Sequence, residues 1–364
     1  MPKEFLFFYK KIKKLMSFSI GIVGLPNVGK STLFKALTKK QVDASNYPFC
    51  TIDPNIGIIA VPDKRMDLLS KVSNSAKIVP TAIEFVDIAG IVKGAHEGEG
   101  LGNKFLANIR EVDAIVQVLR NFSDPNVIHV AGKVDFQSDK ETINMELIFA
   151  DLETIDKRIT ANLKDVKTGK KEAKEIQPLL EKIKVGLENG KLANEIINDK
   201  EEISLIKPLN LLTIKPMIYV LNVDEDKIYD DSDFIAISAK IEAELADLNE
   251  DEAKEYLKEL KLESSGLEKL IKKSYEILGL ITFFTSGEME TKAWTIPNGA
   301  KAPQAAGVIH TDFEKGFIRA EIINWNDLVE EGGESKAKEK GLIRLEGKDY
   351  VMKDGDVAHF RFST

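Results

Sequence analysis

The sequence predicts an α/β fold built on a mostly parallel sheet with helices on both faces. Five short runs are apolar, and each is followed by polar or glycine-rich residues: FSIGIV (18–23), IEFVDI (83–88), AIVQVL (114–119), MIYVLNV (217–223) and FIAIS (234–238). Runs that are apolar on both faces and separated by helical stretches are typical of buried parallel strands. We therefore expect these runs to form the central sheet of the main domain.

A helical rhythm lies between the third and fourth runs. Apolar residues recur three and four positions apart, at Met145, Ile148, Leu152, Ile155, Ile159, Leu163 and Val166, and after the turn TGKK at Ala173, Ile176, Leu180, Ile183 and Leu187. This spacing predicts two helices in an antiparallel hairpin. Their charged outer faces favour a projecting arm, and the alternative is a pair of core helices in the main domain.

From about Ile281 the pattern changes to strand-like segments separated by turn residues. The closing stretch LIRLEGKDYVMKDGDVAHFRF predicts strand, turn and strand, with Gly347, Asp354 and Gly355 at the bends. We expect a small α+β domain at residues 281–364. The main domain is then assigned to residues 17–136 and 206–280, and the arm to residues 137–205.

Composition limits the classes of function. The 364 residues are 43% apolar and 30% charged, which is enough for two or three domains with a sizeable core. The net charge is −8, so binding of nucleic acid through bulk charge is excluded, and any RNA must meet a local basic patch. The single cysteine, Cys50, excludes an internal disulfide framework and favours a reducing compartment, so we expect a cytoplasmic protein.

The first sixteen residues differ from the rest of the chain. They are rich in lysine, and Met16 directly precedes the first predicted strand. We interpret residues 1–16 as a disordered extension or an upstream start, and the alternative is a short amphipathic helix on a membrane surface. No apolar stretch approaches the ~20 residues that span a bilayer, so no membrane partner is expected.

The strongest motif is GLPNVGKS (24–31), which matches G-x-x-x-x-G-K-[ST] between a predicted strand and a predicted helix. Gly24 and Gly29 let the backbone amides turn toward phosphate oxygens, and the helix N-terminus adds its positive end. Lys30 can reach the β- and γ-phosphates, and the Ser31 hydroxyl can bind Mg²⁺. The candidate phosphate-binding residues are Asn27, Val28, Gly29, Lys30, Ser31 and Thr32.

Two further stretches complete a phosphate and metal site. FVDIAG (85–90) places Asp87 at the end of a strand, where it can hold Mg²⁺ through water, and Gly90 where its amide can sense the γ-phosphate. In NYPFCTIDPN (46–55) we nominate Thr51 as the residue that closes over Mg²⁺. Ser31, Thr51 and Asp87 are therefore the candidate magnesium ligands.

With these motifs in this order, the chain resembles the YchF family of Obg-like P-loop nucleotidases. The resemblance runs from about Ser17 to Thr364 and rests on GIVGLPNVGKSTLF, PFCTIDPN, EFVDIAG, VKGAHEGEGLGNKFL, KAPQAAG and IHTDFEKGFIRAE. It implies that the arm is a coiled coil inserted in the nucleotidase domain. It also implies that the last domain is a TGS domain, a β-grasp module associated with RNA or ribosome contact.

The resemblance implies hydrolysis of ATP in preference to GTP, and NVDE (222–225) agrees with it. Guanine sites use Asn-Lys-x-Asp, in which the Asp accepts from guanine N–H groups, and the longer Glu225 is misplaced for that role. Asn222 remains to bind the purine, Val223 stands in place of the Lys, and Ser238 lies in ISAK (237–240), which can serve either purine. Only eleven residues separate NVDE from ISAK, so a helix or strand is missing or truncated there.

Hydrolysis needs a group other than the usual glutamine, because Ile91 follows the D-x-x-G motif. The resemblance implies that a histidine in DPNVIHVAGKVD positions water, so we nominate His129 as the catalytic residue and His96 as the second choice. Asn27 stands where potassium-activated relatives bind K⁺. A hydrogen bond that stabilises the loop is an equal alternative for Asn27.

The predicted function is an Mg²⁺-dependent ATPase that cycles between ATP and ADP states. The nucleotide state would change how the arm and the TGS domain bind a ribosome, a ribosomal subunit or another translation-related partner, in part through RNA. One alternative is a GTP-dependent factor of the Obg type. Another is a ribosome-binding module in which hydrolysis is incidental.

Overall fold

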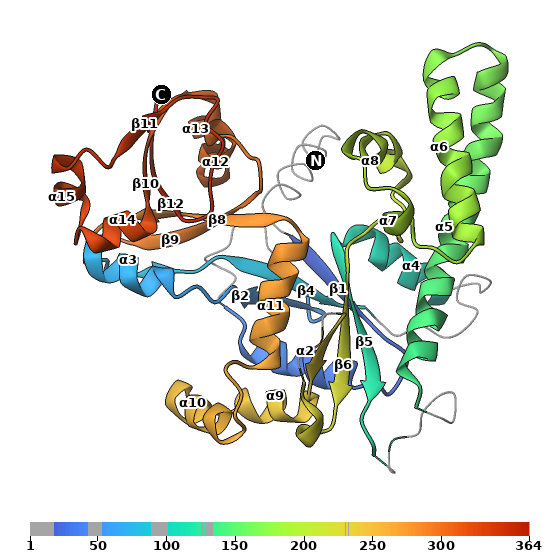
Figure 1. Cartoon of the computed structure of the whole chain (residues 1–364), viewed down its shortest axis with the longest axis horizontal. Coiled ribbons are helices and arrows are strands. Elements are labelled where there is room, and N and C mark those ends of the chain that lie inside the picture. The colour runs from blue at the N-terminus through green and yellow to red at the C-terminus, as the bar shows by residue number, and fades with distance from the viewer. Residues whose placement is uncertain are drawn as a thin grey trace. The chain divides into compact units, whose positions relative to one another are not determined.

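The computed structural model describes residues 18–42, 53–88, 101–124, 127, 134–229, 231 and 233–363 (Figure 1). Its contacts divide the chain into two compact units. One unit consists of Ser19–Lys39 and Phe85–Leu267, and we call it the nucleotide unit. The other includes Lys40–Glu84 and Glu268–Thr364, and we call it the C-terminal unit. The domain boundaries assigned from the sequence stay a prediction beside this division.

The predicted central sheet is present. Its strand order is β2-β4-β1-β5-β6-β7, and the pairs β1/β5, β5/β6 and β6/β7 are parallel. The strands are β1 (Ser19–Val23), β2 (Ile56–Ala60), β4 (Ala82–Asp87), β5 (Ala114–Asn121), β6 (Met217–Val223) and β7 (Phe234–Ile237). The chain places β4 on one side of β1 and β5 on the other, so the strand order reverses beside β1. Parallel sheets bind ligands at the carboxyl ends of strands flanking such a reversal.

The helices of this part follow the strands. Helix α5 packs against β5, and α2 and α9 lie against each other. The bounds are α2 (Lys30–Lys39), α4 (Leu101–Glu111), α9 (Ala239–Leu245) and α10 (Glu250–Glu259), with a 3₁₀ turn η3 (Glu225–Lys227) after β6. Helix α11 (Gly266–Ile277) begins at the end of the nucleotide unit, and its residues from Glu268 onward belong to the C-terminal unit. Among the described residues, the short link from NVDE to ISAK thus keeps a strand, β7, and contains no α-helix.

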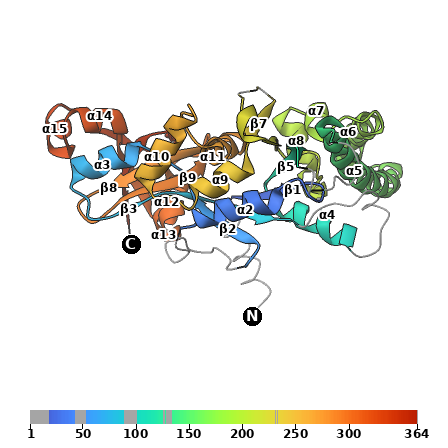
Figure 2. The ribbon, with the colours of Figure 1, turned by 90° about the horizontal axis from the view of Figure 1, so that it is seen from below.

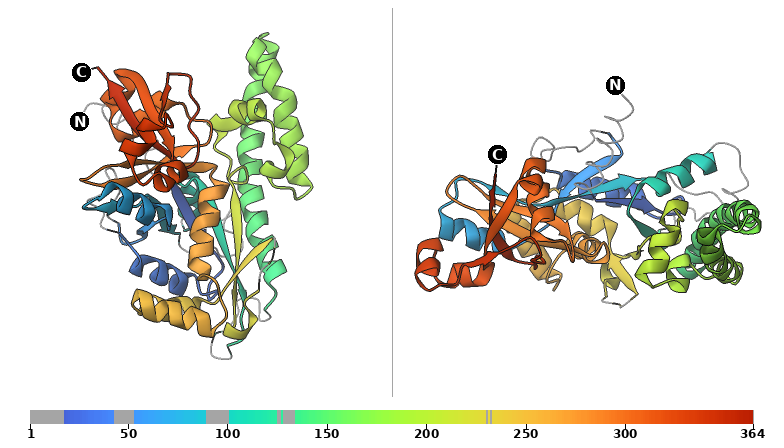
Figure 3. Two further views of the ribbon diagram at one scale, coloured as in Figure 1. Left: turned by 60° about the vertical axis from the view of Figure 1, so that its left-hand side comes forward. Right: turned by 90° about the horizontal axis from the view of Figure 1, so that it is seen from above.

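The predicted helical hairpin is also present. Helices α5 (Phe136–Lys167) and α6 (Lys171–Glu188) run alongside each other and are joined at Gly169, whose φ is +86° (Figure 2, Figure 3). They are followed by α7 (Ala193–Ile196), α8 (Lys200–Ile206) and η2 (Lys207–Leu209). Among the described residues, no helix combines the length and the apolar character that crossing a membrane requires.

The buried residues between α5 and α6 follow the predicted apolar spacing only in part. Ile148, Ile155, Leu180 and other predicted residues form one buried cluster. Met145 and Leu163 share the predicted spacing but are 37% and 43% exposed and lie outside this cluster. Instead Asn162 is buried, because its amide donates to the Ala173 carbonyl (2.7 Å) and to Gln177 (2.9 Å). A buried amide that finds its partners can replace an apolar contact.

The C-terminal unit contains a second sheet, in the order β11-β10-β12-β8-β9-β3. Strand β12 is parallel to β8, whereas β8/β9, β10/β12 and β10/β11 are antiparallel. Its strands are β3 (Ile78–Val79), β8 (Leu280–Ser286), β9 (Thr291–Pro297), β10 (Phe317–Asn324), β11 (Arg344–Glu346) and β12 (Asp356–Phe362). Its helices are α3 (Arg65–Ser73), α12 (Ala302–Ile309), α13 (Thr311–Lys315), α14 (Trp325–Glu330) and α15 (Glu334–Glu339).

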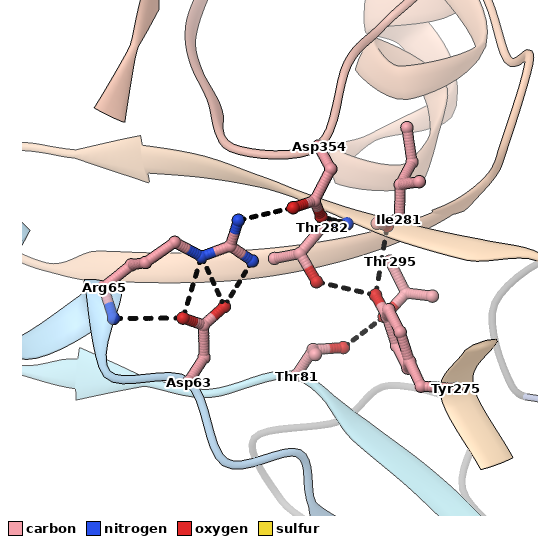
Figure 4. A network of polar contacts seen from close by, with 8 residues as sticks. All are labelled: Asp63, Arg65, Thr81, Tyr275, Ile281, Thr282, Thr295 and Asp354. Atoms are coloured by element: carbon pink, nitrogen blue, oxygen red, sulfur yellow. Dashed lines mark hydrogen bonds and ion pairs between the residues drawn. The ribbon is translucent and has the colours of Figure 1, made fainter. Parts of the chain in front are cut away.

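Arg65 joins α3 to the second sheet (Figure 4). Its guanidinium makes a two-pronged bond to Asp63 (2.9 and 2.7 Å) and also donates to Asp354, whose other oxygen accepts from the Thr282 amide (2.9 Å). Burial alone would lower the pKa of Arg65, and the two carboxylates more than offset this and raise it. The bidentate geometry is the strong form of an Arg–carboxylate bond, so this cluster firmly ties residues distant in sequence.

A hydroxyl network continues from this cluster. Tyr275 donates to the Ile281 carbonyl (3.0 Å), and its oxygen also lies 2.8 Å from the Thr282 hydroxyl and 3.2 Å from that of Thr295, which bonds to Thr81 (Figure 4). Burial raises the pKa of Tyr275 to about 12. The segment before β4 is therefore held to β8 and β9 by side chains as well as by the β3/β9 pairing.

Candidate nucleotide-binding site

The loop of residues 24–31 connects β1 to α2 and has the backbone that its glycines predict. Asn27 and Gly29 both have positive φ, 65° and 88°. A Cβ atom on Gly29 would lie 2.1 Å from Nδ2 of Asn222, and one on Gly24 would lie 2.8 Å from the Val118 carbonyl. Both positions therefore exclude side chains, Gly29 through its backbone angle as well as through crowding.

Asn222 fastens this loop to the rest of the site. Its side-chain amide donates to the Val28 carbonyl (3.0 Å), and its side-chain oxygen accepts from the Ala239 amide (3.0 Å). The residue is 6% exposed and is the last but one of β6. Val28 follows β1 and Ala239 follows β7. The Asn222 side chain, on β6, therefore links the segments after β1 and β7 at the carboxyl edge of the sheet. The Asn222 predicted to meet a purine also shapes the loop that would hold its phosphates.

A cavity of about 1030 Å³ opens at this edge of the sheet. Among its lining are the predicted residues Asn27, Gly29, Lys30, Ser31, Thr32, Asp87, Asn222, Val223 and Ser238. Val28, in the same loop, is 1% exposed, and its carbonyl accepts from the Asn222 side chain. The structure therefore gathers residues from four separate stretches of the sequence around one cavity of a size that suits a nucleotide.

An ion pair lies in this cavity beside the loop of residues 24–31. The Lys30 ammonium contacts the Asp87 carboxylate, and the two side chains are 11% and 20% exposed. Lys30 is the first residue of α2, so the unpaired amides and positive end of that helix lie at the same place. Asp87 thus holds the lysine in position, and Ser31 lies in the same cavity wall.

All four residues of the NVDE stretch line the same cavity. Glu225 pairs with Lys240, and a side-chain hydrogen bond from Lys240 lowers the pKa of the Glu225 carboxyl. Asp224 accepts from the Ser123 amide (3.0 Å) and pairs with Lys227 (2.9 Å), which lowers its pKa. Two lysines that the sequence patterns did not single out thus neutralise the two acidic residues of this motif.

Val223 has a different place from its neighbours. It is 2% exposed and packs in a cluster with Leu119, Leu221 and Ala236. An apolar residue at this position therefore belongs to the core between β5, β6 and β7 and also forms part of the cavity lining.

Comparison with known proteins gives the same order of parts. A family model described as "50S ribosome-binding GTPase" matches residues 19–149, and the YchF-GTPase_C model, described as "Protein of unknown function (DUF933)", matches residues 280–363. The "Ribosome-binding ATPase YchF" of Bacillus subtilis (strain 168) is 53% identical, over 96% of this chain and 100% of its own length. The chain belongs to the YchF family.

Other YchF family members agree in sequence and fold. The "Ribosome-binding ATPase YchF" of Escherichia coli O157:H7 is 49% identical over 96% of this chain and 100% of its own length. The solved structure of the Schizosaccharomyces pombe YchF GTPase is 40% identical, covers 95% of this chain and 98% of its own, and superposes with a TM-score of 0.84. The names of the two bacterial relatives describe an ATPase, whereas the name of the solved structure describes a GTPase.

Several predicted residues of this YchF chain lie outside the described residues. They are Thr51, Gly90, Ile91, His96 and His129, together with residues 1–16. Their assigned roles stay predictions. Within the described part of the chain, no group of three or more His, Cys, Asp or Glu side chains is arranged to hold a metal ion.

The structure adds cavity residues that the sequence patterns missed in this YchF chain. They lie in the loop after β1, after β5, and in or beside the NVDE and ISAK stretches: Leu25, Pro26, Phe122, Ser123, Asp124, Val127, Asp224, Ala239, Lys240 and Ala243. Phe122–Asp124 follow the strand that pairs with β1, so the rule that parallel strands present ligands at their carboxyl ends points to them. No local motif marks them.

Proposed function

We propose that this chain is an Mg²⁺-dependent P-loop nucleotidase that hydrolyses ATP, in preference to GTP, to ADP and phosphate. The observation that carries the proposal is the single cavity shared by the phosphate loop, Asp87 and the NVDE stretch. One end offers a lysine, a helix N-terminus and loop amides, which suit a polyphosphate. The other offers an acidic motif altered from the guanine form. The names of the bacterial relatives support an ATPase.

The residues present fit a magnesium ion that arrives with the nucleotide. Ser31 and Asp87 offer a hydroxyl and a carboxylate in the same cavity, and hard oxygen ligands suit Mg²⁺. Magnesium usually keeps several waters and takes substrate phosphates as ligands, so a cage of carboxylates is not needed. Bound there, the ion would neutralise charge on the phosphate oxygens. Thr51 is the proposed third ligand, and Asn27 is proposed to bind K⁺.

The preference for adenine rests on Glu225 and its neighbour Lys240. A guanine site needs a carboxylate free to accept from the base, whereas Glu225 is one methylene longer and already paired with Lys240. Competition of ATP and GTP for one fluorescent nucleotide tests this preference. Tighter competition by ATP supports it, and tighter competition by GTP favours the second candidate, a GTP-dependent factor. The GTPase name of the fission-yeast structure supports that candidate.

The proposed hydrolysis uses His129 to position water, because the aliphatic Ile91 cannot do so. His129→Ala should lower turnover by about 10²-fold or more at unchanged nucleotide affinity, the usual range for loss of such a group. Unchanged turnover would refute the assignment. Potassium participation is tested by comparing turnover in KCl and NaCl at equal ionic strength, and equal rates would count against Asn27 as a K⁺ ligand.

The proposed role is a switch that binds the ribosome or a ribosomal subunit, with RNA contacts through the C-terminal domain and the arm. It rests on the printed names of the relatives and of the family model matched by residues 19–149. Sedimentation with ribosomes in the presence of ATP, ADP or no nucleotide tests it. Binding that depends on the nucleotide supports a switch. Binding that never depends on it, with no change in turnover, supports a binding module with incidental hydrolysis.

A further inference from the structure

Arg120 is a buried arginine close to the cavity, and neither the motifs nor the proposed mechanism uses it. It lies near the end of β5, opposite Asn222 in the parallel register, and is 2% exposed. Among the described residues, its hydrogen-bond partners are backbone carbonyls: Phe122 (3.4 Å), Val127 (3.0 Å) and Asp124 (3.3 Å). Its guanidinium also lies 4.4 Å from the centre of the Phe122 ring.

These carbonyls belong to one side of the cavity. Phe122, Ser123, Asp124 and Val127 all line it, and we call these four residues the β5 wall. The wall has a second anchor, because the Asp224 carboxylate accepts from the Ser123 amide (3.0 Å). Arg120 thus holds the wall from beneath and Asp224 holds it from the neighbouring strand. Asp224 belongs to the NVDE stretch, so its bond to Ser123 places the wall beside that stretch.

An arginine is suited to this position by its shape. The planar guanidinium presents several donors in fixed directions, so one side chain can satisfy three carbonyls and stack on an aromatic ring. Burying a cation is unfavourable unless its donors are satisfied, and a lysine ammonium cannot reproduce this spread of directions. Because the carbonyls of irregular backbone also need partners, Arg120 and the wall stabilise each other in a single arrangement.

We propose that Arg120 is a positioning residue that fixes the β5 wall, and so fits the cavity to the nucleoside part of its ligand. This inference rests on the proposed nucleotide binding. Lys30, Ser31 and the loop amides, which would hold the phosphates, make none of the described contacts with Arg120. Loss of Arg120 should therefore weaken binding of a whole nucleotide and leave binding of a bare polyphosphate nearly unchanged.

The test measures dissociation constants for ATP and for inorganic tripolyphosphate, both with Mg²⁺, in Arg120→Met and Arg120→Lys. We expect ATP affinity to fall at least about tenfold in both variants, and tripolyphosphate affinity to change less than about twofold. The control is Arg158→Lys on the exposed side of α5, which should match the wild type for both ligands. Equal losses for both ligands, or a lysine variant that behaves like wild type, would overturn the proposal.

A second variant guards against a simple folding defect. Asp224→Ala removes the other anchor from a more exposed position and should give the same pattern, with ATP weakened and tripolyphosphate retained. Combined with Arg120→Met, its effect should be less than additive, because both anchors act on one wall. Additive losses would contradict a shared wall. Failure of the wild type to bind ATP would refute the proposed function itself, an outcome distinct from all of these.

Discussion

The nucleotide cavity and the Arg65 cluster of the C-terminal unit both depend on charged side chains, but they satisfy them differently. In the cavity, counting only the described residues, Lys30 pairs with one carboxylate and Glu225 with one lysine. In the cluster, Arg65 is shared between two carboxylates, and each of these also accepts a backbone amide, Asp63 from Arg65 and Asp354 from Thr282. The cavity keeps ion pairs that a charged ligand can replace, whereas the cluster is closed. A binding site needs exchangeable partners, and a structural joint needs fixed ones.

The largest effect is expected where the cavity backbone allows no substitution. Gly29→Ala should weaken nucleotide binding by more than about 100-fold, because the new methyl group overlaps Asn222 and the backbone angle is strained. The matched control is Gly169→Ala in the arm, which has a similar φ of +86° and open space around it. Isothermal titration with ATP compares them. Similar affinities in both variants would show that the crowding at Gly29 does not matter.

Asn222→Ala should give the next largest effect, because it leaves the Val28 carbonyl and the Ala239 amide without their buried partner. Each unsatisfied buried group costs about 1–3 kcal/mol, so the unfolding free energy should fall by about 2–6 kcal/mol. Urea denaturation measures this loss, and nucleotide affinity should fall with it. A variant that loses affinity at full stability would mean that Asn222 acts on the purine alone.

Arg65→Met tests the closed cluster. It should lower the free energy of unfolding by about 2 kcal/mol, since hydrogen bonds to charged groups contribute about 1.5–3 kcal/mol each and methionine retains part of the packing. Both tryptophans, Trp294 and Trp325, lie in the C-terminal unit, so their fluorescence follows its unfolding during denaturation. Nucleotide affinity should stay within about twofold of wild type. A large loss of nucleotide affinity would show that the Arg65 cluster also contributes to nucleotide binding and is not purely structural.

The smallest effect is expected at the exposed pair of Glu225 and Lys240. Hydrogen bonding from Lys240 lowers the pKa of Glu225, so any stability from the pair is present above the ordinary glutamate pKa and is lost as pH falls through the lowered value. Lys240→Met should move that pKa upward, and NMR titration of the carboxyl measures it. The unfolding free energy should stay within experimental error, because exposed pairs contribute little. No movement of the pKa would mean that the pair does not form in solution.

Local patterns predicted the parts whose causes are local. The phosphate loop, five of the six strands of the main sheet and the helical hairpin each depend on residues within about one element, and the structure contains them. The β5 wall and Arg120 were missed, because their role depends on β5 lying beside β1 and on carbonyls several residues ahead. The dual bond of Asn222 was missed for the same reason, since Val28 is distant in sequence.

The C-terminal unit shows the same limit on a larger scale. The sequence predicted its closing strands, β11 and β12, with a bend at Gly355, whose φ is +86°. It gave no indication that β3 and α3, more than two hundred residues earlier, complete its sheet and core. In the sequence, Arg65 and Asp63 are ordinary charged residues at the start of a helix. Their role in the cluster depends on the contact with Asp354, which no local pattern predicts.

The discontinuous make-up of the C-terminal unit also has a consequence for how the chain is made. Lys40–Glu84 leaves the ribosome before the whole of Phe85–Leu267, and Glu268–Thr364 comes last. At ~5–20 residues per second, synthesis of the intervening stretch takes roughly 10–40 s. During that time β3 and α3 have no second sheet to join, so Met66 and Leu69 lack the apolar partners that later bury them. The nascent chain therefore passes through an obligatory waiting period, in which a chaperone can bind an early segment whose partners are not yet translated.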